Sequence, residues 1–214
     1  MNELDLAALM VSRVCHDLIS PVAAVSNGLE ILADEEDPLM KEQAMSLIAH
    51  SVGQAKARLL FARLAFGAMG SAGAEIDLGE AGEVATEFFK TGKAKLDWQA
   101  PRGAIDKEMI RVLLNLANMA ADSIPRGGQL TVKIEPSRAL VAVTVTAKGT
   151  RANLPQDIRD GLELKTPFSE LTGRTVQPYI TALLARKLGS SIDVTFGPET
   201  VRFDVTFDRK AAAA

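Results

Sequence analysis

Three residues near the N-terminus have the types and the spacing that phosphoryl chemistry would need. His16 is followed directly by an acid, Asp17, and five positions later by Pro21. A neutral imidazole is a good nucleophile near pH 7 and forms a labile phosphoramidate when it takes up a phosphoryl group. Pro21 has no N–H to donate to the carbonyl of Asp17, so a helix through this segment should bend just below the histidine. Asp17 has two open interpretations: it holds a ring nitrogen or a nearby cation, or it is only a solvated acid.

A long amphipathic helix, from about Leu4 to Ala33, is expected to carry His16 on its polar side. Its apolar residues follow the alternating three- and four-residue spacing of helices that pack on other helices. This apolar seam consists of Val11, Val14, Cys15, Leu18, Val22, Val25, Leu29 and Leu32. The polar face carries Ser12, Arg13, His16, Ser20 and Asn27. The spacing alone leaves an ordinary alternative open, a solvated histidine on a core-packing helix.

A second helix is predicted after the acidic break that ends in Asp37 and Pro38, a pair suited to begin a helix. It repeats the heptad spacing with Met45, Ile48, Val52, Ala55, Leu59, Ala62 and Phe66. A hairpin of two helices cannot cover both seams, whereas a second copy would close a four-helix bundle. The sequence therefore predicts a homodimer. His50 has no acid or proline in matching positions, and we expect it to be solvated.

The composition restricts the classes of function. The chain has 214 residues, of which 47% are hydrophobic and 24% charged, with a net charge of -3. These values favour a folded core and indicate neither a nucleic-acid partner nor a membrane surface. No uninterrupted apolar stretch reaches the roughly 18–20 residues of a spanning helix, and the N-terminus lacks a signal-peptide pattern. The single Cys15, interpreted as a packing residue, fits a reducing cytoplasm, which is the expected location.

Glycines at positions 67, 70 and 73 interrupt the helical pattern, which predicts two domains over residues 1–70 and 74–210. The second domain should alternate strands and helices, so the fold class is α+β. Strands are expected at 75–78, 95–99, 129–134, 140–147, 191–196 and 200–207. One helix is expected between the first strand and about residue 89, and two more at 106–123 and 175–188. The closing Ala211–Ala214 run is left out of the fold prediction.

The segment around His16 resembles the phospho-acceptor box of sensor histidine kinases: a histidine, an acid, two variable positions, a small polar residue and a proline. Here these residues are His16, Asp17, Leu18, Ile19, Ser20 and Pro21. The element order after the glycines is similar to the ATP-binding domain of these kinases, the Bergerat fold, most clearly around Asn115. The resemblance implies a helical-hairpin dimerisation domain that forms a four-helix bundle, followed by a Bergerat-type α/β sandwich.

The residues that such kinases use for ATP are missing at three places. Met119 and Asp122 occupy the positions of a magnesium-binding asparagine and a lysine. Asp122 could hold a hydrated magnesium ion, but it would repel a triphosphate. Ala147 replaces the adenine-reading aspartate, Arg151 adds bulk to the same box, and the phosphate loop keeps only Gly173. We therefore expect a degenerate ATPase-like domain with no metal or cofactor of its own.

A reactive-histidine hairpin joined to such a domain resembles the ChpT-type histidine phosphotransferases of alphaproteobacterial cell-cycle phosphorelays. The resemblance covers nearly the whole chain and includes the segment from Leu59 to Gly67. It implies that phosphate passes from the receiver domain of a hybrid histidine kinase (CckA in the family) through His16 to response regulators such as CtrA and CpdR. Magnesium would belong to the receiver. The candidates for receiver binding are Ser12, Arg13, Ser20, Ala24 and Asn27.

Two other functions stay open. One is an ATP-dependent histidine kinase with unusual ATP boxes. The other is a non-catalytic, dimeric regulator that binds a kinase or a receiver through its kinase-like shape.

Overall fold

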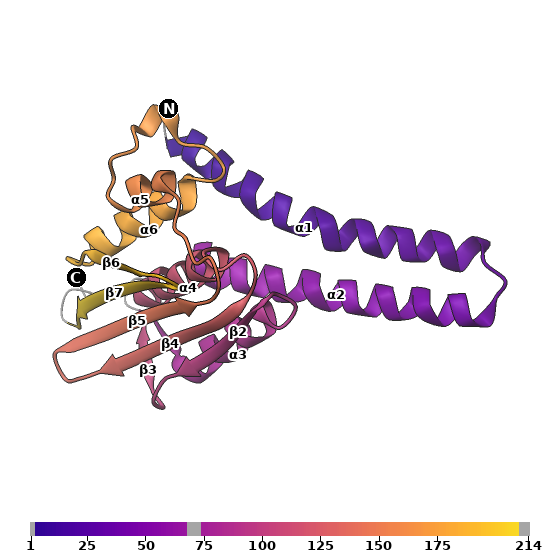
Figure 1. Ribbon diagram of the computed structural model, residues 1–214, viewed down its shortest axis with the longest axis horizontal. Coiled ribbons are helices and arrows are strands. Elements are labelled where there is room, and N and C mark those ends of the chain that lie inside the picture. The colour runs from indigo at the N-terminus through magenta and orange to yellow at the C-terminus, as the bar shows by residue number, and fades with distance from the viewer. Residues whose placement is uncertain (1–2, 68–73, 210–214) are drawn as a thin grey trace.

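A computed structural model describes residues 3–67 and 74–209 (Figure 1). A long helical hairpin projects from a body in which helices pack on a sheet. Gly70 and Gly73, which helped to predict the domain boundary, lie outside the described residues, as does the closing alanine run. The predicted division into two domains stays a prediction.

The hairpin consists of α1 (Glu3–Asp34) and α2 (Pro38–Phe66), as the two apolar seams predicted. Asp37 caps α2, because its carboxylate accepts a hydrogen bond of 2.9 Å from the Leu39 N–H. Pro38 follows at the first helical position, where no N–H is needed. The helices approach closely at Gly28, where an added Cβ would lie 2.6 Å from the Ile48 side chain.

Leu4–Asp34 is long and apolar enough to cross a membrane, by length and composition alone. This corrects the expectation that no segment would qualify, which counted only uninterrupted apolar residues. Helices that pack inside soluble proteins meet the same criterion. On α1 the exposed apolar side chains include Val11, Ile19, Val22 and Leu29, so their exposure needs an explanation outside the single chain.

A five-stranded mixed sheet forms the body, in the order β2-β4-β5-β7-β6. These strands are β2 (Ala94–Gln99), β4 (Gly128–Pro136), β5 (Leu140–Lys148), β6 (Ile192–Gly197) and β7 (Thr200–Asp208). β2 runs parallel to β4, and the other pairs are antiparallel. A separate antiparallel pair joins β1 (Glu75–Asp77) and β3 (Ala104–Asp106). Both strands of this pair have only three residues, too few to show alternation, and the sequence predicted β1 but not β3.

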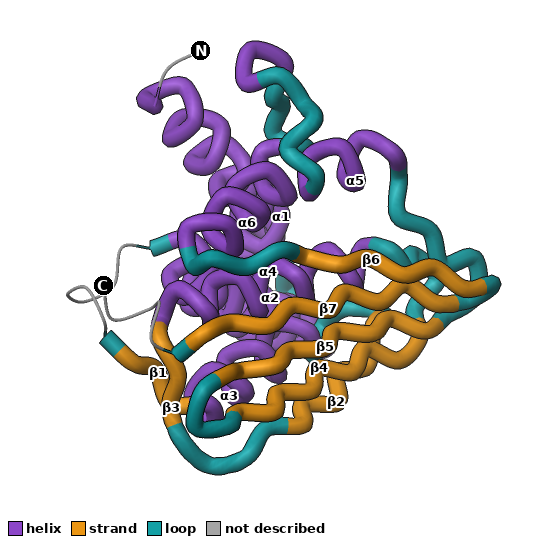
Figure 2. Tube along the Cα trace, turned by 90° about the vertical axis from the view of Figure 1, so that its left-hand side faces the viewer, coloured by secondary structure: helices purple, strands orange, loops and turns teal. Residues whose placement is uncertain are grey.

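The helices gather on one side of this sheet (Figure 2). They are α3 (Leu78–Phe89), α4 (Lys107–Asp122), α5 (Gln156–Leu162), α6 (Val176–Lys187) and the short 3-10 helix η1 (Phe168–Glu170). β5 buries every second side chain against them, which is the pattern that predicted it. The sequence did not predict α5 and η1, because their few residues and nearby prolines leave no helical period to detect.

The end of α2 belongs to the core of the body. Phe61, Leu64 and Ala65 are buried in the same hydrophobic cluster as the side chains of α3, α4 and the sheet. The Phe61 ring stacks on that of Phe88 in α3, with ring centroids 3.8 Å apart. The hairpin and the body are therefore joined by packing as well as by the chain.

Asn115 makes a second connection, inside this joint. Its Nδ2 donates to the carbonyls of Ala65, at 3.0 Å, and Arg111, at 2.8 Å. Its Oδ1 accepts from Nε2 of Gln177, at 2.9 Å. The residue is fully buried, so one amide satisfies groups on α2, α4 and α6 where water has no access.

We expect Asn115→Leu to lower the free energy of unfolding by about 2–4 kcal/mol, because the Ala65 carbonyl and the Gln177 amide would each lose a buried partner. Denaturant unfolding followed by circular dichroism measures this change. Asn153→Ala is the matched control, because that asparagine is exposed, and it should change stability by less than about 0.5 kcal/mol. Equal unfolding midpoints for Asn115→Leu and the unchanged protein would contradict the role of Asn115.

Candidate active site

His16 projects from α1 with its side chain 87% exposed. Its Nδ1 lies 3.4 Å from Oδ1 of Asp17, whose side chain is about half exposed. This distance is at the long end for a hydrogen bond, so Asp17 orients the ring weakly. The imidazole is therefore accessible to a partner protein, and an acid stands beside one of its two nitrogens.

Pro21 is buried one turn below, and α1 continues through it as one helix that changes direction along its length (Figure 1). The missing N–H of Pro21 leaves the Asp17 carbonyl without its usual helical donor. Nη1 of Arg58, on α2, donates to this carbonyl instead. Sequence reasoning singled out Pro21 and Asp17 but not Arg58. Its position opposite Asp17 becomes visible only when the hairpin register is known.

The five candidates for receiver binding occupy different environments. Ser12, Ser20 and Asn27 are exposed, and Ala24 is half-buried. Arg13 is half-buried and turns toward the body, where its Nη1 donates to the carbonyl of Gly173 at 3.4 Å. The assignment of these residues to receiver binding stays a prediction.

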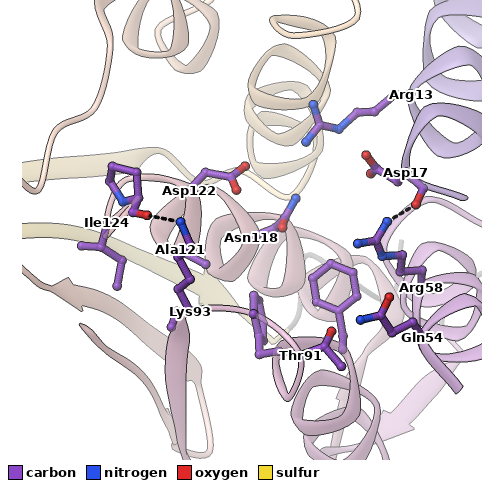
Figure 3. A pocket seen from close by; sticks show the side chains of 15 residues that line it. Arg13, Asp17, Gln54, Arg58, Thr91, Lys93, Asn118, Ala121, Asp122 and Ile124 are labelled. Carbon is purple, nitrogen blue, oxygen red and sulfur yellow. Dashed lines mark hydrogen bonds between the residues drawn. The ribbon is translucent and has the colours of Figure 1, made fainter. Parts of the chain in front are cut away.

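A pocket of about 440 Å³ lies between the hairpin and the body, next to Asp17 (Figure 3). Its polar lining comes from both sides: Arg13, Asp17, Gln54 and Arg58 from the hairpin, and Thr91, Lys93, Asn118 and Asp122 from the body. Nζ of Lys93 donates to the carbonyl of Pro125 at 3.1 Å. Lys93 lies in a short turn between α3 and β2, and no sequence pattern marked it as part of the site.

The Asp122 carboxyl group faces this pocket from the end of α4, and its pKa lies above the usual range for an aspartate. The main cause is desolvation by the surrounding protein. The negative charge of Asp17 acts in the same direction, whereas Arg13 opposes it. The residue as a whole is still exposed, and because water screens its charge, we expect a modest effect on stability.

Asp122→Asn should stabilise the protein at pH 7, by less than about 1 kcal/mol. A raised pKa means that the folded protein holds this proton more tightly than the unfolded chain does. The contribution of Asp122 is therefore complete below its unfolded pKa and is lost as the pH rises through the folded pKa. The advantage of Asp122→Asn should shrink as the pH falls toward about 4. Thermal unfolding of both proteins between pH 7 and about pH 4 measures this difference in stability.

Asp193→Asn on β6 controls for the change in net charge, because this aspartate is exposed and is not among the residues that line the pocket. A stability difference for Asp122→Asn that is constant with pH, or that is negative at pH 7, would contradict the prediction.

The body contains the positions that the kinase resemblance assigns to ATP contacts, and Asp122 and Arg151 among them are exposed. Met119 and Ala147 are buried in its core, and Arg151 adopts a left-handed backbone with φ of 60°. A second pocket, of about 130 Å³, is lined by Met119, Ser123 and Leu154 among others. Pockets for small ligands usually measure roughly 300–1,000 Å³. Within residues 3–67 and 74–209, no cluster of three or more His, Cys, Asp or Glu side chains could hold a metal ion.

The helical hairpin, the sheet and the covering helices define a protein with the fold of histidine kinases. The histidine kinase domain of the blue-light activated kinase EL346 from Erythrobacter litoralis has a similar fold, with a TM-score of 0.52. It is 16% identical and covers 90% of this chain, which itself covers 98% of that domain. A likeness of this degree concerns the fold alone.

Residues 78–200 match the family described as histidine phosphotransferase C-terminal domain. Protein phosphotransferase ChpT from Brucella abortus (strain 2308) is 41% identical over 203 residues, which cover 95% of this chain and 96% of that protein. A bacterial phosphotransferase solved at 1.7 Å has a TM-score of 0.85 and 39% identity, covering 96% of this chain and 97% of its own. The chain belongs to the ChpT family of histidine phosphotransferases, which confirms the resemblance and the α+β fold class.

Proposed function

We propose that this chain relays a phosphoryl group from the receiver aspartate of a hybrid histidine kinase, through His16, to the aspartate of response regulators. CckA-like donors and CtrA-like or CpdR-like acceptors are the partners that the family membership favours. The observation that carries the proposal is His16 itself, 87% exposed, beside Asp17 and above Pro21 in a member of this family. An interior histidine could not meet an aspartyl phosphate on another protein.

Each transfer is an in-line displacement at phosphorus. Asp17 is nearest to Nδ1, so it favours the tautomer with the proton on that nitrogen and leaves the lone pair of Nε2 free. Nε2 attacks the phosphoryl group, the receiver carboxylate leaves, and the reverse displacement loads the second aspartate. The magnesium ion would be held by the receiver, where it would neutralise charge on the phosphoryl group. The share of this chain is to present the ring in the required geometry.

The residues of the body at the positions that bind ATP in histidine kinases support this proposal. Met119 offers a thioether, a poor magnesium ligand, and Ala147 has no carboxylate to accept the amine of adenine. The neighbouring pocket of about 130 Å³ is smaller than a nucleotide requires. We therefore propose that ATP is not the phosphate donor and that the body serves as a docking surface for receivers, together with the exposed polar face of α1.

We further propose that two copies form a four-helix bundle in the cytoplasm, without a membrane or nucleic-acid partner. Gly28 lies against Ala44 and Ile48, and Arg58 bonds to Asp17, so the register of the two helices is known. At this register, exposed apolar residues lie at similar heights on α1 and α2: Leu29 with Met45, Val22 with Val52, and Cys15 with Leu59. Heptad steps separate these three layers, as in a helical bundle. We call these six residues the apolar stripe.

The proposed function is tested by separating the two possible phosphate sources. The isolated receiver of a hybrid kinase from the same genome is phosphorylated with acetyl phosphate and magnesium, freed of donor, and mixed with the chain. Acid-labile, base-stable phosphate on His16 is expected within this mixture, and none with ATP and magnesium alone. Labelling from ATP would instead support the histidine kinase. A receiver complex in which no phosphate moves would support the non-catalytic regulator.

A further inference from the structure

We propose that Arg58 is a positioning residue for phosphotransfer, because it fixes the backbone beside His16 by bonding to the Asp17 carbonyl. The inference rests on the proposed function, since it concerns how His16 meets the phosphoryl group. Figure 3 shows the bond between the Arg58 guanidinium and the backbone of Asp17.

The need for such a bond follows from the proline. In an unbroken helix, the N–H of residue 21 would donate to the carbonyl of residue 17. Pro21 has no N–H, and its ring pushes against this same carbonyl. The carbonyl is part-buried, so leaving it unpaired would cost free energy. Arg58 supplies a charged donor, which makes a stronger hydrogen bond than a neutral one.

The bond also crosses from one helix to the other. Arg58 belongs to α2, whose later residues are buried in the core of the body. The Asp17 carbonyl lies in the peptide between Asp17 and Leu18, one residue beyond the Cα of His16. A change in the helix geometry at this carbonyl would therefore shift the neighbouring Cα that carries the imidazole. Arg58 therefore links the orientation of the histidine to the rigid part of the molecule. A proline-weakened helix alone would give the ring a wider range of positions.

Phosphotransfer is sensitive to this range, because in-line attack needs the nucleophile close to phosphorus and aligned with the leaving oxygen. A misplacement of about 1 Å can cost an enzyme roughly 100-fold in rate. We expect Arg58→Met to slow transfer from a phosphorylated receiver to His16 about tenfold at saturating receiver. Methionine keeps an apolar stem and loses the donors. Arg58→Lys retains a charged donor group and should recover part of the rate.

The decisive measurement is a double-mutant cycle with Pro21→Ala. This substitution restores an N–H that pairs with the Asp17 carbonyl and so makes the Arg58 bond redundant. Arg58→Met should cost about tenfold in the original background and less than about twofold when combined with Pro21→Ala. Single-turnover rates are measured with the acetyl-phosphate-treated receiver, and receiver affinity by calorimetry. A general loss of packing would slow both backgrounds equally.

Lys41→Met is the matched control, because it removes a cation from an exposed position at the far end of the same helix. It should transfer at the original rate. An Arg58→Met rate equal to that of Lys41→Met, or an equal loss in both proline backgrounds, would overturn the inference. Weaker receiver affinity with an unchanged saturated rate would overturn it too, because Arg58 would then be a docking residue. If the unchanged protein gains no phosphate on His16, the proposed function fails instead, which separates the two tests.

Discussion

His16→Gln is expected to abolish phosphotransfer, with a rate at least about 10⁴-fold below that of the unchanged protein. Glutamine retains polarity and similar reach, but its amide nitrogen is not a nucleophile, so no phosphorylated intermediate forms. The side chain is 87% exposed and its only short polar contact with a side chain is the one to Asp17, among the contacts of the described residues. The free energy of unfolding and receiver affinity should therefore remain near their original values. Single-turnover transfer from a phosphorylated receiver measures the loss.

His50→Gln is the matched control, because His50 is an exposed histidine on α2 and contacts Gln54, with 3.1 Å between their side-chain nitrogens. It has no acid beside it and no proline below it. We expect its transfer rate to stay within about twofold of the original, as for most surface substitutions. Acid-labile phosphate on the His16→Gln variant, lost again in the double variant with His50→Gln, would assign the nucleophile to α2.

Leu29→Glu is expected to convert the proposed dimer into monomers. In the proposed bundle, Leu29 of each copy enters the interface, so the substitution buries two carboxylates without partners. Each unpaired buried charge costs several kcal/mol, so two of them strongly disfavour association of the two copies. In the single chain, Leu29 is 55% exposed, so the fold of the monomer should survive. Light scattering coupled to gel filtration measures the molecular mass.

Leu183→Glu tests whether any exposed leucine would have this effect. Leu183 lies on α6 and is 37% exposed, but it belongs to the body and not to the apolar stripe. We expect this variant to remain dimeric. A Leu29→Glu protein with dimeric mass would show that the apolar stripe is not the interface, and Val52→Glu would then test the α2 side separately.

Most of the helices and strands could be predicted, because local chemistry specifies them. Asp37 and Pro38 begin α2, Asp106 caps α4, and Gly189 ends α6 with a φ of 70°. The alternation along β5 reports the one face that is buried. In each case the signal lies within a few residues of the element that it predicts.

The remaining features depend on contacts between distant residues. Arg58 is 41 positions from Asp17, and no local pattern distinguishes it from other arginines on α2. Arg13 has the spacing of the exposed face but turns toward Gly173, 160 positions away. The sequence did single out His16, Asp17 and Pro21 as the candidate site, because those residues are neighbours and their combination is specific. It could not show which residues of the body surround them.

The joint at the end of α2 has a mechanical consequence. A histidine kinase must bring bound nucleotide to its histidine, which requires a hinge between the hairpin and the nucleotide-binding part. Here the Phe61–Phe88 stack and the Asn115–Ala65 bond hold that junction at a set angle. In the proposed relay no nucleotide has to reach His16, so the hairpin and the body can present one surface of fixed shape to a receiver. Substitutions within the joint would change the angle between the hairpin and the body. They would therefore change which receivers fit, although no residue in contact with a receiver is altered.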